Sequence, residues 1–200
     1  MTQQQLMLLS WLLGSVGCRI MKNDKLNIDL IDFIKLTLDD LSLLFKWLNE
    51  PHVHEFYDKD KSNTIEDVEK RYAPKIKGEK PTDCYFALYD NKPVGYIQKY
   101  KVNDYPELGD YLDYDDTVIS IDLFIGDIDF MGKGFGSLML SEFIKSVVFA
   151  DSSVTSCMIG PEPSNKRAIR AYEKVGFQHV QTLRIGDEPE EAYVMELSKN

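Results

Sequence analysis

Residues 160–177 read GPEPSNKRAIRAYEKVGF, and this stretch decides the fold that we predict for the chain. It has the pattern of a strand exit, then a helix with Ser164 as its N-cap, then a stop at Gly176. Asn165 and Tyr172 are two helical turns apart, so they lie ~10.5 Å from each other on one face of that helix. The stretch therefore predicts a helix with one face along which a thread-like ligand can lie.

A second stretch, MGKGFGS at residues 131–137, lies where a predicted strand turns into a helix. The first amides of a helix have no partner within it and the helix dipole adds positive potential, so an anionic group can bind there without side chains. The dinucleotide-binding pattern does not fit, because Gly136 follows Gly134 too closely. The ATP-type loop fails as well, since Gly134 stands where Ser or Thr is needed. Alone, the stretch fits either an anion site or a tight-turning loop.

Strands and helices alternate on both sides of these two stretches, which predicts one mixed α/β domain over residues 26–200. Helix-start boxes, apolar residues at helical spacing and short β-branched or aromatic runs define the elements. We predict strands at residues 28–36, 84–89, 94–100, 118–125, 154–159, 177–183 and 192–197. We predict helices that end before Pro51, that run from Thr64 to about Tyr72, that run from the glycines to Phe149, and that span residues 164–175. The domain is expected to have a mixed central sheet flanked by helices.

Residues 1–25 are expected to be an N-terminal extension. The apolar run Leu6–Leu13 has no Lys or Arg before it, whereas signal peptides normally open with positive charge. A non-essential extension therefore fits better than a targeting segment, which stays open as the alternative.

Composition narrows the classes of partner. The 200 residues include 23 Lys+Arg and 33 Asp+Glu, for a net charge of −10, which disfavours nucleic acid and favours a cationic ligand. We expect no membrane partner, because no apolar run reaches the ~18 residues of a membrane-spanning helix. Three cysteines are too few and odd in number for a disulfide framework, so we expect a reducing, cytoplasmic location.

Acidic residues gather in the second half of the chain. Residues 102–132 hold nine acidic side chains and no basic one, with tyrosines between them, and a second acidic cluster lies at residues 187–191. Their combined potential would attract a polycation, although ordinary solubility explains the charge equally well.

The glycine stretch and the run Asn-x-Arg-Ala-Ile-Arg-x-Tyr-Glu-Lys-x-Gly-Phe together resemble the GNAT acyltransferase superfamily, and the order of elements agrees over residues 28–197. Within it, residues 45–49 (FKWLN), 95–98 (GYIQ) and Ile121-Asp122 look like the aminoglycoside 6'-N-acetyltransferases. Amine acyltransferases of siderophore assembly share much of this pattern. The resemblance implies direct transfer of acetyl from acetyl-coenzyme A to a primary amine, in a monomer or homodimer.

The resemblance also implies roles for residues on the donor side. Asn165 would hydrogen-bond the pantetheine arm, and Tyr172 would protonate the departing thiolate; from the residues alone, Tyr172 could instead be a core tyrosine. A backbone amide near residues 123–125 would polarise the thioester carbonyl. Met131 stands where the superfamily usually has Gln or Arg, so amides must do more of the phosphate binding. The implied coenzyme-binding residues are Leu123, Phe124, Ile125, Lys133, Gly134, Phe135, Gly136, Ser137, Asn165 and Ala168.

The amine side faces a protonation barrier. An alkylammonium of pKa ~10.4 is neutral about once in 2,500 molecules at pH 7, a barrier of roughly 4.6 kcal/mol. Asp122 is the candidate catalytic carboxylate by position and resemblance. At an ordinary pKa of ~3.9 it would be a poor base, so we expect it to orient and attract the ammonium while a water relays the proton, and nearby carboxylates could raise its pKa. The alternative is a strand-end structural acceptor.

Further residues are expected on the substrate side, and one departs from the family. Many aminoglycoside 6' enzymes have an Asp where this chain has Gly160; Glu162 compensates, or the substrate range is narrower. The expected substrate-binding residues are Trp47, Tyr57, Gln98, Asp122, Glu162 and Asp187.

Three rival functions stay open, whereas a metal site is not expected. The rivals are a siderophore-pathway amine acyltransferase, a protein N-terminal acetyltransferase and a non-catalytic coenzyme-binding module. We expect no metal site, because His52 and His54 lack a nearby Cys pair to complete a tetrahedron.

Overall fold

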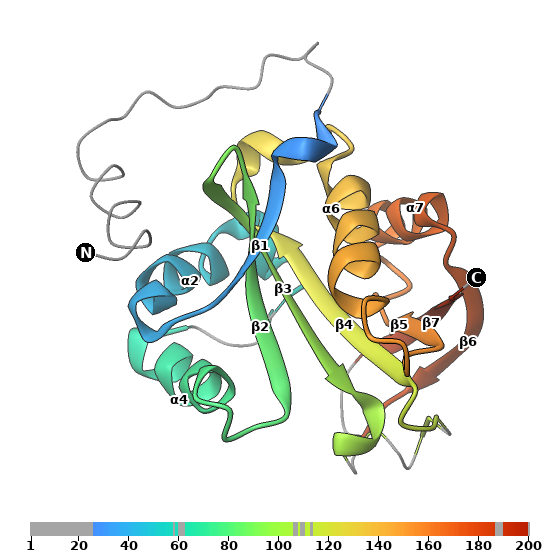
Figure 1. Ribbon diagram of the computed structural model, residues 1–200. Helices are drawn as coiled ribbons and strands as arrows, with labels where there is room; N and C mark the ends of the chain where they lie inside the picture. The colour runs from blue at the N-terminus through green and yellow to red at the C-terminus, as the bar shows by residue number, and fades with distance from the viewer. Residues whose placement is uncertain are drawn as a thin grey trace.

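Seven strands pair into one mixed sheet in the computed structural model of the protein (Figure 1). The structure describes residues 26–57, 59, 63–105, 108, 111–112, 114–186 and 190–199. The strand order is β1-β2-β3-β4-β5-β7-β6, and β4 and β5 are the parallel pair, while the other neighbours are antiparallel. The strands are β1 (Ile31–Lys35), β2 (Thr82–Tyr89), β3 (Lys92–Lys101), β4 (Val118–Ile125), β5 (Ser156–Ile159), β6 (Gln178–Arg184) and β7 (Glu191–Ser198).

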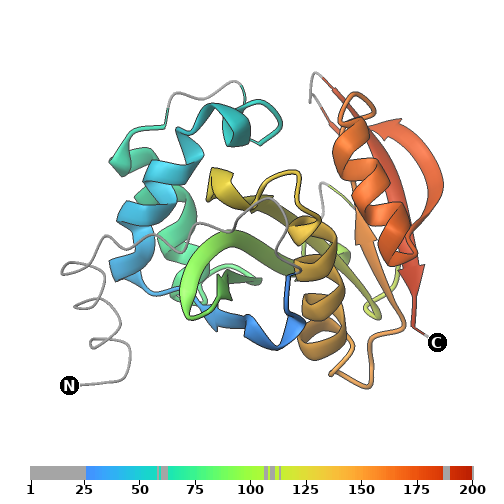
Figure 2. The same ribbon diagram turned by 90° about the horizontal axis from the view of Figure 1, so that it is seen from above.

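Helices cover both faces of the sheet. They are α2 (Leu41–Leu48), α3 (Pro51–His54), α4 (Ile65–Ile76), α6 (Phe135–Phe143), which continues as a π-helical turn at Ile144–Val148, and α7 (Lys166–Val175). Short 3₁₀ turns lie at Ile28–Leu30, Leu38–Asp40, Val102–Asp104 and Ile128–Phe130. Seen from above, α2 and α4 lie on one side of the sheet and α6 and α7 on the other (Figure 2).

Alternation along the strands builds a separate core under each helix layer. Tyr96 and Phe124 pack with α2 and α4, whereas Ile97 and Ile121 pack with α6 and α7. Because successive side chains of a strand point to opposite faces, a strand buried on both faces reads as a nearly continuous apolar run. The central position of β3 and β4 follows from this pattern. The mixed sheet with flanking helices confirms the predicted fold class.

Strands β4 and β5 separate after a short stretch of pairing, and this separation positions the functional site. They pair only from Val118 to Ser120 with Ser156 to Met158. Beyond that point β4 continues to Ile125, and β5 ends at Ile159. The last residues of β4 therefore have no strand beside them on this side.

Most predicted elements are confirmed, with corrections at several element ends. The first predicted strand opens as a 3₁₀ turn, and only Ile31–Lys35 pairs. Helix α4 continues past Tyr72 and through Pro74 to Ile76. A further helix, α3, begins at Pro51, because proline is well placed at the first position of a helix.

The N-cap of α7 is Asn165 and not Ser164. The Asn165 side chain accepts a hydrogen bond from the Ala168 amide at 3.1 Å. The Ser164 hydroxyl instead donates to Glu162 Oε2 at 3.0 Å. Gly176 ends the helix with φ 110°, as predicted.

The predicted strands at residues 84–89 and 94–100 pair as the antiparallel hairpin of β2 and β3. Its turn residues Asp90 and Asn91 have φ of 49° and 61°, values that favour short polar residues in tight β-hairpins.

Within the described part of the chain, no helix combines the length and the apolarity needed to cross a membrane. The predicted N-terminal extension, residues 1–25, lies outside the described residues.

Candidate active site

A cavity of about 370 Å³ opens where β4 and β5 separate. Its wall combines the end of β4, the glycine stretch before α6, the loop after β5, one face of α7 and part of α3. Twelve of the predicted site residues line it: Tyr57, Asp122, Leu123, Phe124, Ile125, Gly134, Gly136, Ser137, Glu162, Asn165, Ala168 and Tyr172. Segments far apart in the sequence thus meet in one space.

The start of α6 supplies backbone amides to this cavity. Gly134 is the N-cap with φ 85°, and Gly132 has φ 74°, so both adopt the left-handed conformation that glycine tolerates. The amides of the first helical turn have no intrahelical partner. Gly136 and Ser137 line the cavity, which places this turn against any anionic group inside it. The donor set fits a pyrophosphate.

Two residues predicted for coenzyme binding do not line the cavity with their side chains. Phe135 is fully buried in the core beside Phe130 and Tyr89, so only its backbone amide can face a ligand. Lys133 is partly exposed and does not line the cavity.

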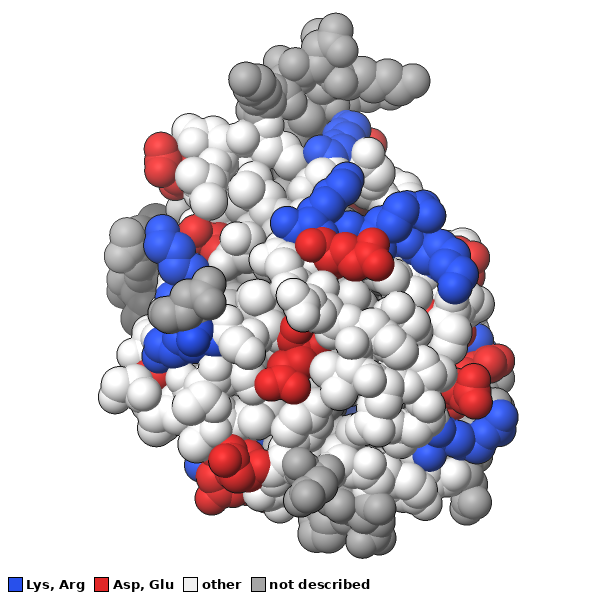
Figure 3. Space-filling model, turned by 90° about the vertical axis from the view of Figure 1, so that its right-hand side faces the viewer, with Lys and Arg blue, Asp and Glu red and all other residues white. Residues whose placement is uncertain are grey.

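Helix α7 carries cations that the sequence analysis missed. Arg167, Arg170 and Lys174 line the cavity together with Asn165 and Ala168. These three cations recur at helical spacing, and this pattern in the sequence could have identified them as one face of the helix. Figure 3 faces the side of the molecule that carries α7 and shows Lys and Arg side chains gathered across its upper part. The α7 wall is therefore positive, which suits a phosphorylated ligand.

Asp122 lies in the cavity wall near the end of β4, on the face that packs toward α2 and α4. Its Oδ2 accepts a hydrogen bond of 2.7 Å from Nε2 of Gln98, the directly paired residue on β3. Burial raises the pKa of Asp122, while the Gln98 hydrogen bond and the positive charge of Lys75 oppose that rise. The carboxylate is thus a stronger base than an exposed aspartate.

Tyr172 lies on α7 with only 8% of its surface exposed, yet it still lines the cavity. Burial raises the pKa of its hydroxyl, and the negative charge of Asp122 adds to this effect. The hydroxyl makes no hydrogen bond with any residue that the structure describes. It therefore stays protonated at neutral pH and is available to donate.

The aromatic side of the cavity is built in two layers. Tyr57 and Phe124 line it, with ring centroids 4.9 Å apart. Trp47, which we expected to contact substrate, instead packs behind Phe124 in the core and is 5% exposed. A Cβ on Gly126 would lie 2.1 Å from Cδ2 of Trp47, so glycine is required beside the indole. Trp47 shapes the wall from behind.

Gln98 also occupies a different place from the one we predicted. It is 7% exposed and lines a second, smaller cavity of about 160 Å³ with Lys75 and Tyr105. Its side-chain amide is engaged by Lys75, Tyr96 and Asp122 and does not line the main cavity. The register of β3 against β4 places it there, beside Asp122.

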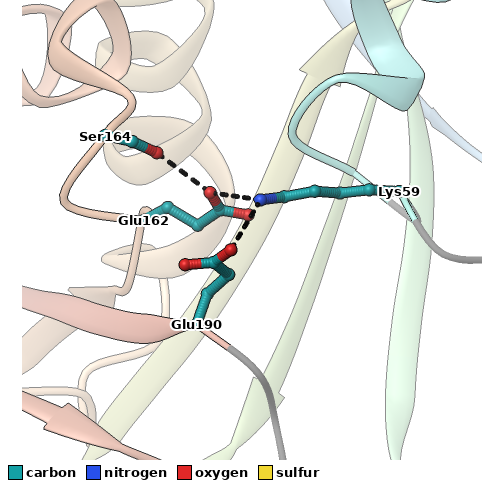
Figure 4. Close-up of polar contacts among 4 residues, drawn as sticks. All are labelled: Lys59, Glu162, Ser164 and Glu190. Carbon is teal, nitrogen blue, oxygen red and sulfur yellow. Dashed lines mark hydrogen bonds and ion pairs between the residues drawn. The ribbon is translucent and has the colours of Figure 1, made fainter.

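Glu162 lies at the edge of the cavity in a network of charges (Figure 4). Its Oε2 is 2.7 Å from Nζ of Lys59, which comes from the segment between α3 and α4. Lys59 also lies 3.4 Å from Oε1 of Glu190. Asp187, the remaining predicted substrate contact, lies outside the described residues.

Among the residues that the structure describes, the acidic run at 102–132 contributes one side chain to this cavity. Of the nine acidic residues at 102–132, Glu107, Asp110 and Asp113 lie outside the described residues, and of the other six only Asp122 lines the cavity. The residues before Val118 precede β4, whereas the cavity opens at the other end of this eight-residue strand, roughly 25 Å away. Of the described residues, Asp122 and Glu162 are the acidic ones that line the cavity, which is also lined by the cations of α7.

The histidines and cysteines that the structure describes form no metal-binding cluster. His52 Nε2 contacts the Ile125 carbonyl oxygen at 3.1 Å and so ties α3 to the end of β4. Cys84 and Cys157 are buried free thiols, and burial raises the pKa of both. The described residues contain no group of three His, Cys, Asp or Glu side chains that could hold a metal ion.

The open end of β4, the glycine-started helix and the Asn165–Tyr172 face together define a class of protein. Residues 37–185 match the family model of the acetyltransferase (GNAT) domain, and the chain belongs to this family.

Within the family, particular relatives are similar over most of the chain. The aminoglycoside N(6')-acetyltransferase type 1 of Klebsiella pneumoniae is 32% identical over 155 residues, which cover 77% of each chain. A kanamycin resistance protein of Rhizobium radiobacter is 37% identical over 75 residues, 38% of this chain and 68% of that protein. The crystal structure of the aminoglycoside acetyltransferase AAC(6')-Ib in complex with coenzyme A has a TM-score of 0.76 and 30% identity, and it covers 84% of this chain and 95% of its own.

Proposed function

We propose that this protein transfers acetyl from acetyl-coenzyme A to a primary amine, the 6'-amine of an aminoglycoside antibiotic, and thereby confers resistance in the cytoplasm. The observation that carries the proposal is the single cavity shared by the start of α6, Tyr172 and Asp122. The similarity to enzymes named for this activity supports the choice of substrate.

The donor side is assigned to α6 and α7. The coenzyme supplies a thioester-activated acetyl group. The free amides at Gly134–Ser137 bind its pyrophosphate, and Arg167, Arg170 and Lys174 compensate the remaining negative charge. These side chains take the place of the Gln or Arg that Met131 does not supply. Asn165 can offer its Nδ2 hydrogens to the pantetheine arm, because its Oδ1 already accepts from Ala168.

The amine side is assigned to Asp122 and Glu162. A carboxylate in a partly buried wall attracts an ammonium more strongly than one in water does. Asp122 orients the reacting amine toward the thioester and takes up its proton directly or through a water. Its raised pKa makes that proton transfer less uphill than the transfer to an ordinary aspartate.

Tyr172 completes the transfer. The amine attacks the thioester carbon directly, so the C–N bond forms as the C–S bond breaks and no acyl-enzyme is required. The protonated Tyr172 hydroxyl donates to the thiolate that departs. The amides of β4 from Leu123 to Ile125 lack a strand partner on the cavity side and are placed to polarise the thioester carbonyl.

A thiol-release assay tests the function. We expect coenzyme A release from acetyl-coenzyme A with kanamycin-class amines, and much less release with lysine derivatives or peptides. Turnover only on lysine derivatives would select the siderophore-type reaction, and turnover only on peptides the N-terminal acetyltransferase. Acetyl-coenzyme A binding without turnover on any amine would select the non-catalytic module.

Substitution of Asp122 tests the amine-side assignment. Asp122→Asn keeps the shape and the Gln98 contact but removes the charge, so we expect kcat/KM for the amine to fall on the order of 10²-fold or more. Calorimetry should give an acetyl-coenzyme A affinity within about twofold of wild type, because Asp122 lies away from the α6 amides. Normal turnover by this variant would remove Asp122 from the reaction.

A further inference from the structure

One lysine outside the main cavity is connected to the carboxylate inside it. Lys75 of α4 donates from Nζ to Oε1 of Gln98 at 3.0 Å. Gln98 in turn donates from Nε2 to Oδ2 of Asp122 at 2.7 Å. Lys75 lines the small second cavity and Asp122 lines the main one, with the amide of Gln98 between them.

The direction of these hydrogen bonds is determined by the groups at the two ends. An ammonium can only donate, and an ionised carboxylate can only accept. Gln98 therefore has to present its carbonyl oxygen to Lys75 and its NH₂ group to Asp122. The Tyr96 hydroxyl, 2.7 Å from the same Oε1, adds a second donor and favours the same orientation. A flipped amide would place donor against donor and acceptor against acceptor.

We infer that Lys75 is a positioning residue for the amine-side carboxylate, and that it acts through the Gln98 amide. Its ammonium orients Gln98, whose N–H then holds one oxygen of Asp122 and limits rotation of the carboxylate in the cavity wall. The same positive charge stabilises the ionised form of Asp122, which must be present to receive the substrate ammonium. The inference deepens the proposed function and rests on it for the identity of the amine.

The charged and titratable groups around Asp122 come from three elements. Lys75 on α4 stabilises the carboxylate, and the Tyr100 hydroxyl on β3 does the same, while burial opposes both. Tyr172 on α7 faces it from the cavity side. Burial lowers the pKa of Lys75, and the nearby charges of Lys80 and Arg71 add to this, while Cys84 and Asp122 favour its charged form. Among these groups Lys75 is the cation that opposes the effect of burial on Asp122. Its removal should therefore raise the pKa of Asp122.

The test compares Lys75→Met with Lys75→Arg in the full chain. Loss of the cation should raise the pKa of Asp122, so the acid limb of the kcat/KM profile should move to higher pH. We expect an Asp122 titration by ¹³C NMR, with its signal assigned by its loss in Asp122→Asn, to shift by the same amount. Lys75→Arg should keep the wild-type profile, because it retains both the charge and the donor. A structural role alone would lower stability without moving this titration.

Two further variants keep the test decisive. Lys77→Met removes an exposed lysine just after the same helix and changes net charge equally, so it should leave the Asp122 titration where it is. Gln98→Met removes the amide that joins Lys75 to Asp122. This variant should raise the pKa of Asp122, and it can be measured even if Lys75→Met fails to fold. An unmoved Asp122 titration in folded Lys75→Met, or in Gln98→Met, would overturn the inference. Absence of turnover in the wild type would refute the proposed function. The NMR titration would still test whether Lys75 acts on Asp122 through Gln98.

Discussion

The hydroxyl of Tyr172 illustrates how burial at a single residue sets chemistry. A tyrosine of raised pKa remains protonated over the whole neutral range, so it can act as an acid but not as a base. For Tyr172→Phe we expect the chemical step to slow by on the order of 10²-fold, because the thiolate must then leave without a donor. Single-turnover kinetics measure this step apart from product release.

Phenylalanine fills the same space, so Tyr172→Phe should keep its stability and its acetyl-coenzyme A affinity. The packing against Phe177, with ring centroids 6.2 Å apart, does not involve the hydroxyl. Equal single-turnover rates in the two proteins would exclude Tyr172 as the proton donor.

At the scale of the element, the first turn of α7 combines a structural and a binding task in Asn165. Asn165→Ala removes the N-cap acceptor and should lower the free energy of unfolding by about 1 kcal/mol. Asn165→Asp retains an acceptor for the Ala168 amide, so it should stay close to wild type in denaturant unfolding.

The same pair of variants separates capping from ligand binding. Both lack the Nδ2 hydrogens that we assign to the pantetheine arm, and both should bind acetyl-coenzyme A several-fold more weakly by calorimetry. If Asn165→Asp binds the coenzyme as tightly as wild type does, Asn165 serves α7 alone.

At the scale of the whole molecule, ion pairs connect segments that are far apart in the sequence. Lys59 precedes α4, while Glu162 and Glu190 lie in loops of the C-terminal half, and the ion pairs connect these segments beside the cavity (Figure 4). The Lys59 side chain is one-third exposed, so salt screens its pair with Glu162. A substrate ammonium can therefore take the place of the Lys59 ammonium beside Glu162.

Lys59→Met should therefore lower KM for the polycationic aminoglycoside by a few-fold at low salt. The reason is that Glu162 no longer has an internal cation that the substrate must displace. The gain should shrink as ionic strength rises from about 0.05 to about 0.5 M. Lys145→Met, at an exposed site on the π-helical turn, changes net charge equally and serves as control. Equal KM changes in both variants would show a general charge effect and no competition at Glu162.

Local patterns in the sequence determined much of the fold. Alternation and apolar runs predicted β2, β3 and β4 because burial on each face follows a period of two. The stop of α7 at Gly176 was equally predictable, since the left-handed conformation there excludes most other residues. The position of its N-cap was not, because Ser164 and Asn165 are comparable caps and the turn that joins Asn165 to the Glu162 carbonyl decides between them.

The sequence by itself also identified Asp122, Gly134 and Tyr172 as candidates, through their positions at a strand end, a helix start and a helix face and through the resemblance to the GNAT superfamily. Only the tertiary structure decided what surrounds them. The separation of β4 from β5 creates the cavity, and the register of β3 on β4 puts Gln98 beside Asp122. The packing of α4 then brings Lys75 to the same amide. Charges at positions 75 and 122 become neighbours through sheet pairing and helix packing, and such contacts between distant segments leave no periodic trace in the sequence.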